Sequence, residues 1–469
     1  MIICVNSPAS TQTINMKKGI IFSATLLFTV YAVLAQRPAK FSDEMKTSQV
    51  AAVKAATAHA WKGYKKYAWG KDDLQPLSKT GKNWYKHSML MTPVDAFDTF
   101  LVLGLTTEAA EAKKLILDSL SFDNDNEVQV FEVTIRILGG LITAYELDGD
   151  ARFLQLATDL ADRMLPAFAT PTGMPYRYVQ LQTGAVRDGI NNPAEIGTLM
   201  MEFGQLSKHT HNNKYYDIAK KAIMYVYNQR STINLVGEQI DVNTGKWVQQ
   251  NSHISGYIDS YYEYLYKCWS LFGDKDFKEA FDQHNAAIKK YLLAITPNGT
   301  FLKVVNMHSG KQVATTYGAL DAFYAGLCAF AGDVPLAADI QKANYYMWTR
   351  FGMEPEQFDF ASDKILSPAY ILRPENIESC FYLYKLTQHL EYLWMGKVML
   401  DDILKYCKTE EAFASIKNVE TKEQSNSMQS FFFAETLKYA YLLFAPEDAF
   451  DLNNAVFNTE AHPFKILKK

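Results

Sequence analysis

Acidic residues that lie inside apolar segments are the side chains of this sequence best suited to chemistry. They are Glu132, Asp259, Glu263, Glu375, Glu378 and Glu435. Burying an isolated charge is costly, so each of these carboxylates needs a partner or a polar cavity. A pocket with several carboxylates and aromatic rings suits hydrolysis of a glycosidic bond, in which one acid protonates the leaving oxygen and another activates water or attacks the sugar.

The alternative for each acid is a structural ion pair. Arg136 lies one helical turn after Glu132, and Arg373 is close to Glu375. Any one of these acids, taken singly, is explained more simply in this way. Several acids that converge on one cavity would instead indicate a catalytic or binding site.

Glu375 and Glu378 are spaced so that both lie at the start of one helix. They follow Pro374, a residue favoured in the first turn. The helix dipole favours ionised carboxylates at this end, and a catalytic base must be ionised.

The chain after residue 35 reads almost entirely as helix, because apolar residues recur at spacings of three and four. About 14 helices are predicted, at 43–68, 92–104, 107–120, 127–147, 151–165, 193–208, 213–229, 253–272, 275–293, 314–331, 334–351, 374–387, 389–406 and 427–444. Asp150, Asp274 and Thr387 are predicted to cap the fifth, ninth and thirteenth of these helices.

The segments between the helices indicate one domain over residues 36–469. The loops at 166–192, 230–252 and 294–313 carry Pro, Gly or Asn, and some alternate apolar and polar residues as short hairpins do. No linker or low-complexity run divides the chain, and no repeat of fixed period indicates an open solenoid. We expect helix pairs that close into a ring.

Composition and charge exclude some classes of partner. The formal net charge is −4 with mixed acids and bases, so no basic surface for nucleic acid is expected. Aromatic residues make up 13% of the chain. They suit sugar stacking, but composition alone favours the simpler explanation, a large aromatic core.

The N-terminus has the features of an export signal. Lys17 and Lys18 precede an apolar run over 19–34, and Ala35 supplies a small residue at a cleavage point. We therefore expect a signal peptide at 1–35, with a possible start at Met16, and a secreted or periplasmic protein. A membrane anchor is the alternative, but the run is short for a span, so no stable membrane insertion is expected. Gln36 stands where a lipoprotein would have Cys.

The cysteines predict neither a metal cluster nor a defined disulfide. Cys268, Cys328, Cys380 and Cys407 lie in apolar, helix-like contexts without the spacing of metal ligands. Buried free thiols are expected.

Motifs along most of the chain together resemble glycoside hydrolase family 47, the class I α-1,2-mannosidases. The segments that carry the resemblance are Ala60–Trp69, Asp72–Ser78, Asp95–Thr99, Phe131–Gly140, Leu165–Pro175, Ala194–Thr198, Asp259–Leu265, Leu372–Glu375, Met428–Tyr439 and Phe457–Pro463. The resemblance implies an all-α fold, an (α/α)7 barrel, and inverting hydrolysis of α-1,2-linked mannose in N-glycan-type or related mannosides.

The resemblance also implies roles for individual residues. Glu132 matches the general acid, Glu375 the base that activates water, and Asp259 a third essential carboxylate; either Glu132 or Asp259 delivers the proton. Arg136, Glu195, Arg373 and Phe431 match sugar-contacting positions, Phe431 as a stacking face.

A calcium ion is the implied cofactor. Thr459 matches the residue that binds Ca²⁺ through its hydroxyl and carbonyl oxygens, and Glu460, Glu378 and Glu435 would hold waters or sugar hydroxyls around it. The segment around Thr459 is expected to plug one end of the ring as a hairpin-like element.

The chain departs from the family pattern at three places. The first cysteine of a family disulfide would fall near Ala322, and Cys328 has no partner near 340–350. The segment Val305–Gly310 is more similar to the ER degradation-enhancing mannosidase-like branch. Tyr257 stands where some relatives carry an Arg that steers branch choice. A catalytically weak glycan-binding or quality-control protein on the same fold is therefore the alternative function.

Overall fold

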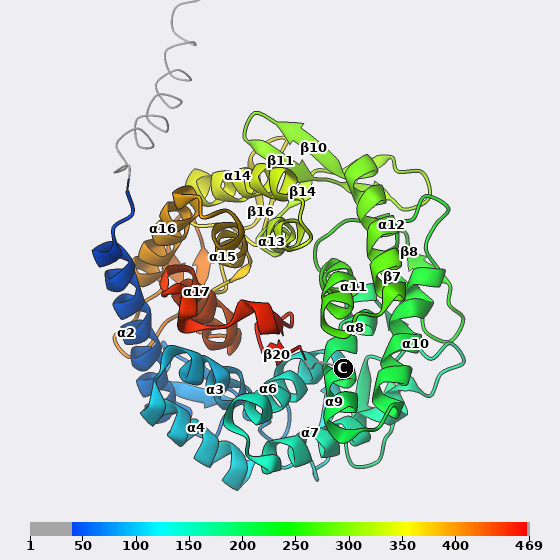
Figure 1. Cartoon of the computed structure of the whole chain (residues 1–469), viewed down its shortest axis with the longest axis horizontal. Coiled ribbons are helices and arrows are strands. Elements are labelled where there is room, and N and C mark those ends of the chain that lie inside the picture. The colour runs from blue at the N-terminus through cyan, green and yellow to red at the C-terminus, as the bar shows by residue number, and fades with distance from the viewer. Residues whose placement is uncertain (1–39, 467–469) are drawn as a thin grey trace, which may run out of the picture. The chain divides into compact units, whose positions relative to one another are not determined.

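Fourteen helices alternate between an outer and an inner ring in residues 40–466, the part of the chain that the computed structural model describes (Figure 1). The predicted signal peptide at 1–35 lies outside the described residues. The outer helices are α2 (Asp43–Tyr67), α4 (Thr106–Ser119), α7 (Ala151–Met164), α10 (Lys214–Asn228), α12 (Lys275–Tyr291), α14 (Val334–Phe351) and α16 (Leu390–Tyr406).

The inner ring includes four helices that are built from more than one segment. The inner helices are α3 (Met91–Leu103), α5–η1–α6 (Val130–Glu132, Val133–Leu138, Gly139–Asp148), α8–α9 (Pro193–Gly197, Met200–Thr210), α11 (Asp259–Phe272), η3–α13 (Leu320–Ala322, Phe323–Phe330), α15 (Glu375–Thr387) and η4–α17 (Phe432–Leu437, Lys438–Phe444). The segments η1 and η4 are π-helical, a local widening that is frequent at functional sites.

Burial explains why the two rings differ in sequence. Every residue of α17 is buried, because it is covered by α2 outside and by α3 and α15 beside it. The outer helix α7 instead buries a single stripe at spacings of three and four, formed by Phe153, Ala157, Leu160, Ala161 and Met164. The packing of α17 on α3 closes the ring.

Two of the three predicted helix caps are confirmed. The side chains of Asp150 and Asp274 accept hydrogen bonds from the backbone N–H groups of the first turns of α7 and α12. The prediction for Thr387 is wrong. Thr387 is the last residue of α15, its hydroxyl donates to the Leu383 carbonyl one turn back at 2.7 Å, and α16 starts only after His389.

The predicted starts of four inner helices, at 127, 253, 314 and 427, are wrong by three to six residues, since these helices begin at 130, 259, 320 and 432. The preceding residues are apolar because they are buried in strands and turns, as Val128, Ile254, Tyr317 and Met428 show. Apolar content alone does not separate such a strand from a buried helix.

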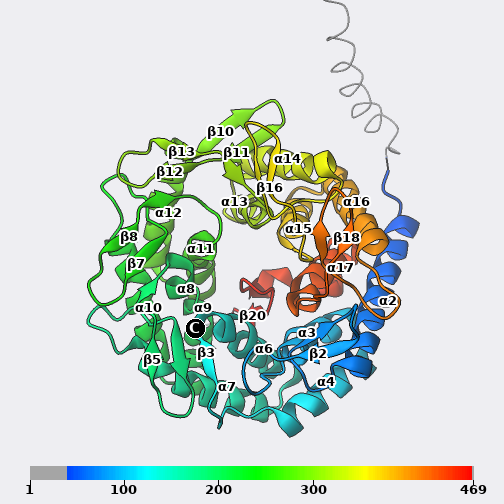
Figure 2. The ribbon, with the colours of Figure 1, turned by 180° about the vertical axis from the view of Figure 1, so that it is seen from behind.

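Short antiparallel sheets occupy the predicted hairpin loops and the entries to the inner helices (Figure 2). The three-stranded sheets are β3-β4-β5 (Glu127–Gln129, Tyr178–Gln180, Val186–Arg187), β6-β7-β8 (Ile190–Asn191, Gln239–Asp241, Trp247–Gln249), β9-β12-β13 (Asn251–Ser252, Val304–Asn306, Gln312–Ala314) and β14-β15-β16 (Thr316–Tyr317, Gln357–Asp359, Lys364–Ser367). The two-stranded sheets are β1-β2 (Asp73–Gln75, Thr80–Lys82), β10-β11 (Leu293–Thr296, Gly299–Leu302), β17-β18 (Ile416–Asn418, Glu423–Gln424) and β19-β20 (Ala455–Phe457, Pro463–Lys465).

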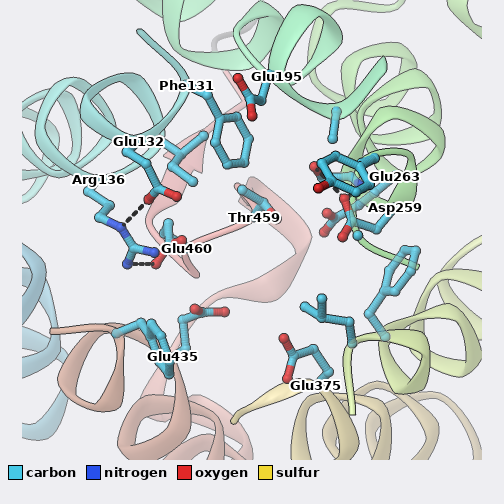
Figure 3. Close-up of a pocket in the computed structure, with 18 of the residues that line it drawn as sticks. Phe131, Glu132, Arg136, Glu195, Asp259, Glu263, Glu375, Glu435, Thr459 and Glu460 are labelled. Atoms are coloured by element: carbon cyan, nitrogen blue, oxygen red, sulfur yellow. Dashed lines mark hydrogen bonds and ion pairs between the residues drawn. The ribbon is translucent and has the colours of Figure 1, made fainter. Parts of the chain in front are cut away.

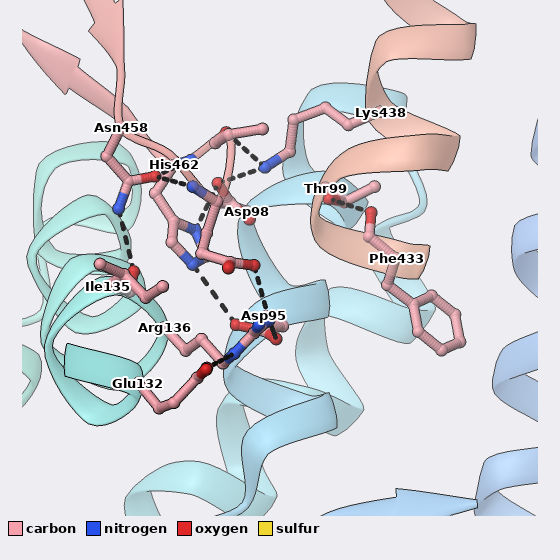
Figure 4. Close-up of polar contacts among 12 residues, drawn as sticks. Asp95, Asp98, Thr99, Glu132, Ile135, Arg136, Phe433, Lys438, Asn458 and His462 are labelled. Atoms are coloured by element: carbon pink, nitrogen blue, oxygen red, sulfur yellow. Dashed lines mark hydrogen bonds and ion pairs between the residues drawn. The ribbon is translucent and has the colours of Figure 1, made fainter. Parts of the chain in front are cut away.

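The C-terminal hairpin β19-β20 lies inside the ring of inner helices (Figure 1). The Asn458 amide donates to the Ile135 carbonyl at 2.9 Å and to Glu202 on α9 at 2.8 Å. His462 lies 3.2 Å from Asp98 on α3, and Lys438 on α17 donates to both Asp98 and the Ala461 carbonyl (Figure 4). The turn of the hairpin is therefore held from four inner helices, while its role as a plug of one end stays a prediction.

Two further observations complete the fold. The four cysteines in the described residues are buried free thiols. None of the helices in residues 40–466 has the length and the apolar content that a membrane span needs.

Candidate active site

A cavity of about 300 Å³ opens among the inner helices and the turn of the C-terminal hairpin (Figure 3). All the site residues predicted from the sequence line it, namely Glu132, Arg136, Glu195, Asp259, Arg373, Glu375, Glu378, Phe431, Glu435, Thr459 and Glu460. The structure adds Phe131, Ser260, Leu320 and Phe323, and it places the candidate acid Glu263 and Tyr257 in the same wall.

The cavity collects the N-terminal ends of inner helices. Asp259 and Glu375 are the first residues of α11 and α15, and Leu320 is the first residue of η3. Glu132 ends the short α5, directly before the π-helical turn η1. Because the acids converge on one cavity, a shared site explains them better than independent ion pairs do.

Arg136 holds the acid on one side of this cavity. Its Nε donates to Glu132 Oε2 at 2.9 Å, and its Nη1 lies 2.6 Å from Glu460 Oε2 and 3.5 Å from Asp95 Oδ2. The guanidinium also lies 5.5 Å from the centroid of the Phe431 ring. One buried cation thus links the predicted acid, the residue after Thr459 and the predicted stacking face.

Arg373 pairs mainly with a residue that was not predicted. Its Nη2 donates to Glu356 Oε2 at 2.9 Å, whereas its Nη1 reaches Glu375 Oε1 only at 3.4 Å. The expected ion pair with Glu375 is therefore the weaker of the two. Glu195 is likewise held by a partner that was not predicted, because Arg177 binds both of its carboxylate oxygens at 2.7 and 2.8 Å.

Burial governs the ionisation of the other predicted acids. It raises the pKa of Asp259 to about 6, against the hydrogen bonds that this carboxylate accepts from Ser260. It also raises the pKa of Glu375 to about 7, because the charge of Arg373 compensates for burial only in part. Burial therefore outweighs the effects that favour the ionised form of Glu375, the expected influence of the helix dipole among them.

The wall near Thr459 holds a second group of acids. Burial raises the pKa of Glu378 to about 8 against the opposing charge of Lys267, and it raises that of Glu435 well above the usual range, with a further increase from Glu460, Glu375 and Glu378. Lys267, fully enclosed, forms an ion pair with Glu263. Mutual repulsion among acids that share one site is relieved by a bound cation.

This donor set fits calcium better than a metal that needs a protein cage. Within residues 40–466, no group of three or more His, Cys, Asp and Glu side chains is arranged to chelate a metal. The half-buried Thr459 and the acids around it are all oxygen donors, and Ca²⁺ accepts oxygen ligands from protein, water and substrate alike.

The residues that sequence reasoning missed fall into two kinds. Phe131 and Phe323 are apolar wall residues without any local signal. Glu356 and Arg177 act on predicted residues that are 17 and 18 positions away in the chain, so their partners became visible only in the folded structure.

Comparisons with known proteins indicate one family. The family model described as glycosyl hydrolase family 47 matches residues 56–466. ER degradation-enhancing alpha-mannosidase-like protein 2 of Mus musculus is 36% identical over 447 residues, which cover 88% of this chain and 76% of that protein. Mannosyl-oligosaccharide 1,2-alpha-mannosidase IB of Homo sapiens is 36% identical over 453 residues, covering 88% and 69%.

A solved structure supports the same assignment. The alpha-1,2-mannosidase from Trichoderma reesei superposes with a TM-score of 0.84 at 28% identity, covering 90% of this chain and 99% of that one. The expected all-α fold, an (α/α)7 barrel, is confirmed by this match. A barrel of paired helices, an acid-lined cavity and a match over most of the length lead to one conclusion: the chain belongs to glycosyl hydrolase family 47 and is a glycoside hydrolase.

Proposed function

We propose that the chain is a calcium-dependent, inverting exo-α-1,2-mannosidase that removes terminal α-1,2-linked mannose from N-glycan-type or related mannosides. The observation that carries the proposal is the presence of Glu132, Asp259 and Glu375 in one cavity with Thr459. The names of relatives such as the human mannosyl-oligosaccharide 1,2-alpha-mannosidase IB support the choice of linkage. The sequence of the N-terminus supports a secreted or periplasmic location.

In this proposal Glu375 is the base. Its Oε2 atom is buried without a protein hydrogen-bond partner among the described residues, which leaves it free to accept a proton from the attacking water. Glu132 or Asp259 protonates the leaving oxygen from the other side of the sugar. Inversion requires that water, rather than Glu375 itself, attack the anomeric carbon.

The remaining wall residues bind and orient the sugar. Phe431 offers an aromatic face between Arg136 and Arg373, whose guanidinium groups lie 5.5 and 5.8 Å from its ring centroid. Thr459 would hold the calcium ion together with waters bound by Glu378, Glu435 and Glu460. When bound, the ion would grip mannose hydroxyls and offset the negative charge of the wall.

A catalytically weak glycan-binding or quality-control protein is the second candidate. The observation in its favour is the 36% identity to the mouse ER degradation-enhancing alpha-mannosidase-like protein 2. The complete set of matched acids in the cavity favours the enzyme.

Hydrolysis of α-1,2-mannobiose, followed with and without a chelator, separates the two candidates. We expect turnover that stops on removal of calcium and returns when calcium is added back. NMR of the first-formed product should show the β-anomer of mannose. Turnover that persists after complete calcium removal would refute the metal requirement, and an initial α-anomer would refute inversion.

A further inference from the structure

Glu356 binds the edge of the Arg373 guanidinium that is formed by Nε and Nη2. It lies between α14 and β15, and its two carboxylate oxygens accept from Arg373 Nε at 3.1 and 3.2 Å and from Nη2 at 2.9 Å. Both side chains are mostly enclosed, with 18% and 17% of their surfaces exposed. A two-pronged pair of this kind fixes the plane and position of a guanidinium.

Glu375 contacts the same guanidinium only through Nη1. Arg373 Nη1 approaches Glu375 Oε1 at 3.4 Å, which is a long contact for a charge-assisted hydrogen bond. The second oxygen, Oε2, has no protein partner among the described residues although it is buried. A guanidinium free to turn could bind both oxygens of Glu375 side by side, and neither oxygen would then be left without a hydrogen-bond donor.

We propose that Glu356 is a positioning residue that holds Arg373 away from a two-pronged pair with Glu375, so that Glu375 keeps one oxygen free to accept the proton of water. The inference rests on the proposed function, because it assigns Glu375 the role of the base. It adds to that function a residue that does not line the cavity at all.

The charges around Glu375 agree with an Arg373 that binds Glu356 more closely than Glu375. The charged or titratable groups that interact with Glu375 are Arg373, Glu356, Asp259, Glu354, Glu378, Glu435 and Tyr370. Arg373 is the cation in this set, and it interacts with Glu356, Glu354 and Glu435 as well as with Glu375. Burial raises the pKa of Glu375 to about 7, Arg373 lowers it, and the charge of Glu356 raises it further, so a neutral residue in place of Glu356 must lower it.

The test is the variant Glu356→Gln, which removes the charge and keeps the shape. We expect the pKa of Glu375 to fall by about one unit, the size of shift that a nearby charge produces. Isotope-edited infrared titration of ¹³C-labelled glutamate carboxyls, with Glu375→Gln as the reference that assigns the band, measures this directly. The same shift should move the acidic limb of kcat/KM to lower pH and reduce kcat several-fold with little change in KM.

Glu111→Gln is the matched control. Glu111 also forms an ion pair, with Lys65 at 2.6 Å, and accepts from Trp61 at 2.9 Å, but it lies on the outer helix α4 away from the cavity. It should leave both the infrared titration and the pH profile unchanged. Glu356→Asp keeps the charge on a shorter side chain and should restore most of the wild-type profile.

The outcomes separate this inference from the proposed function. An infrared pKa of Glu375 that stays within about 0.2 units of wild type in Glu356→Gln would overturn the inference. A shifted pKa in a protein whose wild-type form does not hydrolyse α-1,2-mannobiose would support the positioning role and refute the mannosidase. Should Glu356→Gln not fold, Glu356→Asn, which also removes the charge, decides by the same titration, and an unchanged pKa of Glu375 contradicts the inference.

Discussion

Lys438→Met should destabilise the barrel strongly, because Lys438 is a fully buried cation that joins three parts of the ring. Its Nζ lies 2.8 Å from Asp98 Oδ2 on α3 and donates to the Ala461 carbonyl of the C-terminal hairpin at 2.7 Å. Burial opposes ionisation of Asp98, but Lys438 and His462 outweigh it, and the pKa of Asp98 lies below its usual range.

The size of the effect follows from these distances. At an effective dielectric constant of about 20, two unit charges at 2.8 Å attract by roughly 6 kcal/mol, and most of this attraction offsets the cost of burying them. Removal of one partner from such a pair costs about 3–5 kcal/mol, since the other charge stays buried. His462 remains 3.2 Å from Asp98, so we expect the lower end, about 3 kcal/mol.

Urea unfolding followed by tryptophan fluorescence measures the loss. Lys397→Met is the matched control, because Lys397 pairs with Asp401 on the surface of α16 and an exposed pair contributes less than about 1 kcal/mol. The double variant Lys438→Met/Asp98→Asn should recover at least half of the loss, because it removes the unpaired carboxylate and the remaining buried cation, His462, still has Asp95 at 3.5 Å. A Lys438→Met midpoint no lower than that of Lys397→Met would refute the reasoning.

Three further outcomes are expected. Glu375→Gln should lower kcat on α-1,2-mannobiose by about 10²–10⁴-fold with the fold unchanged by circular dichroism, and near-wild-type turnover would contradict its assignment as the base. The wild-type kcat/KM should fall about tenfold per pH unit below pH 7, because burial raises the pKa of Glu375 to about 7 and its protonated form cannot accept a proton; a profile that is flat between pH 5 and 7 would exclude this group. Thr459→Val should weaken calcium binding in calorimetry at least tenfold, whereas Thr158→Val, on the outer helix α7, should leave it unchanged; equal affinities would remove Thr459 from the metal site.

The sequence predicted the barrel well because helical periodicity is a local property. Segments such as 151–165 carry both a capping Asp150 and a regular apolar stripe, and the helix found there ends within one residue of its prediction. The starts of the inner helices were harder to predict, because buried strands precede them. At Val128 and Tyr317 the chain is as apolar as a helix would be but extends into a sheet.

The site residues could be predicted from the sequence because the motifs contain the side chains that line the cavity. The partners of Arg373 and Glu195 could not be predicted, since Glu356 and Arg177 lie 17 and 18 residues away in the chain and leave no pattern in the sequence. The rise of the Glu375 pKa to about 7 could not be predicted for the same reason. Helix position is visible in the sequence, but the depth of burial that outweighs it depends on walls from several distant segments.

Closure of the ring by its first and last inner helices, α3 and η4–α17, has a consequence for how the chain folds during synthesis. Thr99 on α3 donates to the Phe433 carbonyl at 2.9 Å across 334 residues. Asp98 accepts a hydrogen bond from Lys438 across 340 residues. A ribosome delivers Glu132 early but Phe431, Glu435, Thr459 and Glu460 last, so a nascent chain carries Asp98 without Lys438 and His462 for most of its growth. Joining of distant segments, rather than helix formation, then sets the rate at which a competent cavity appears.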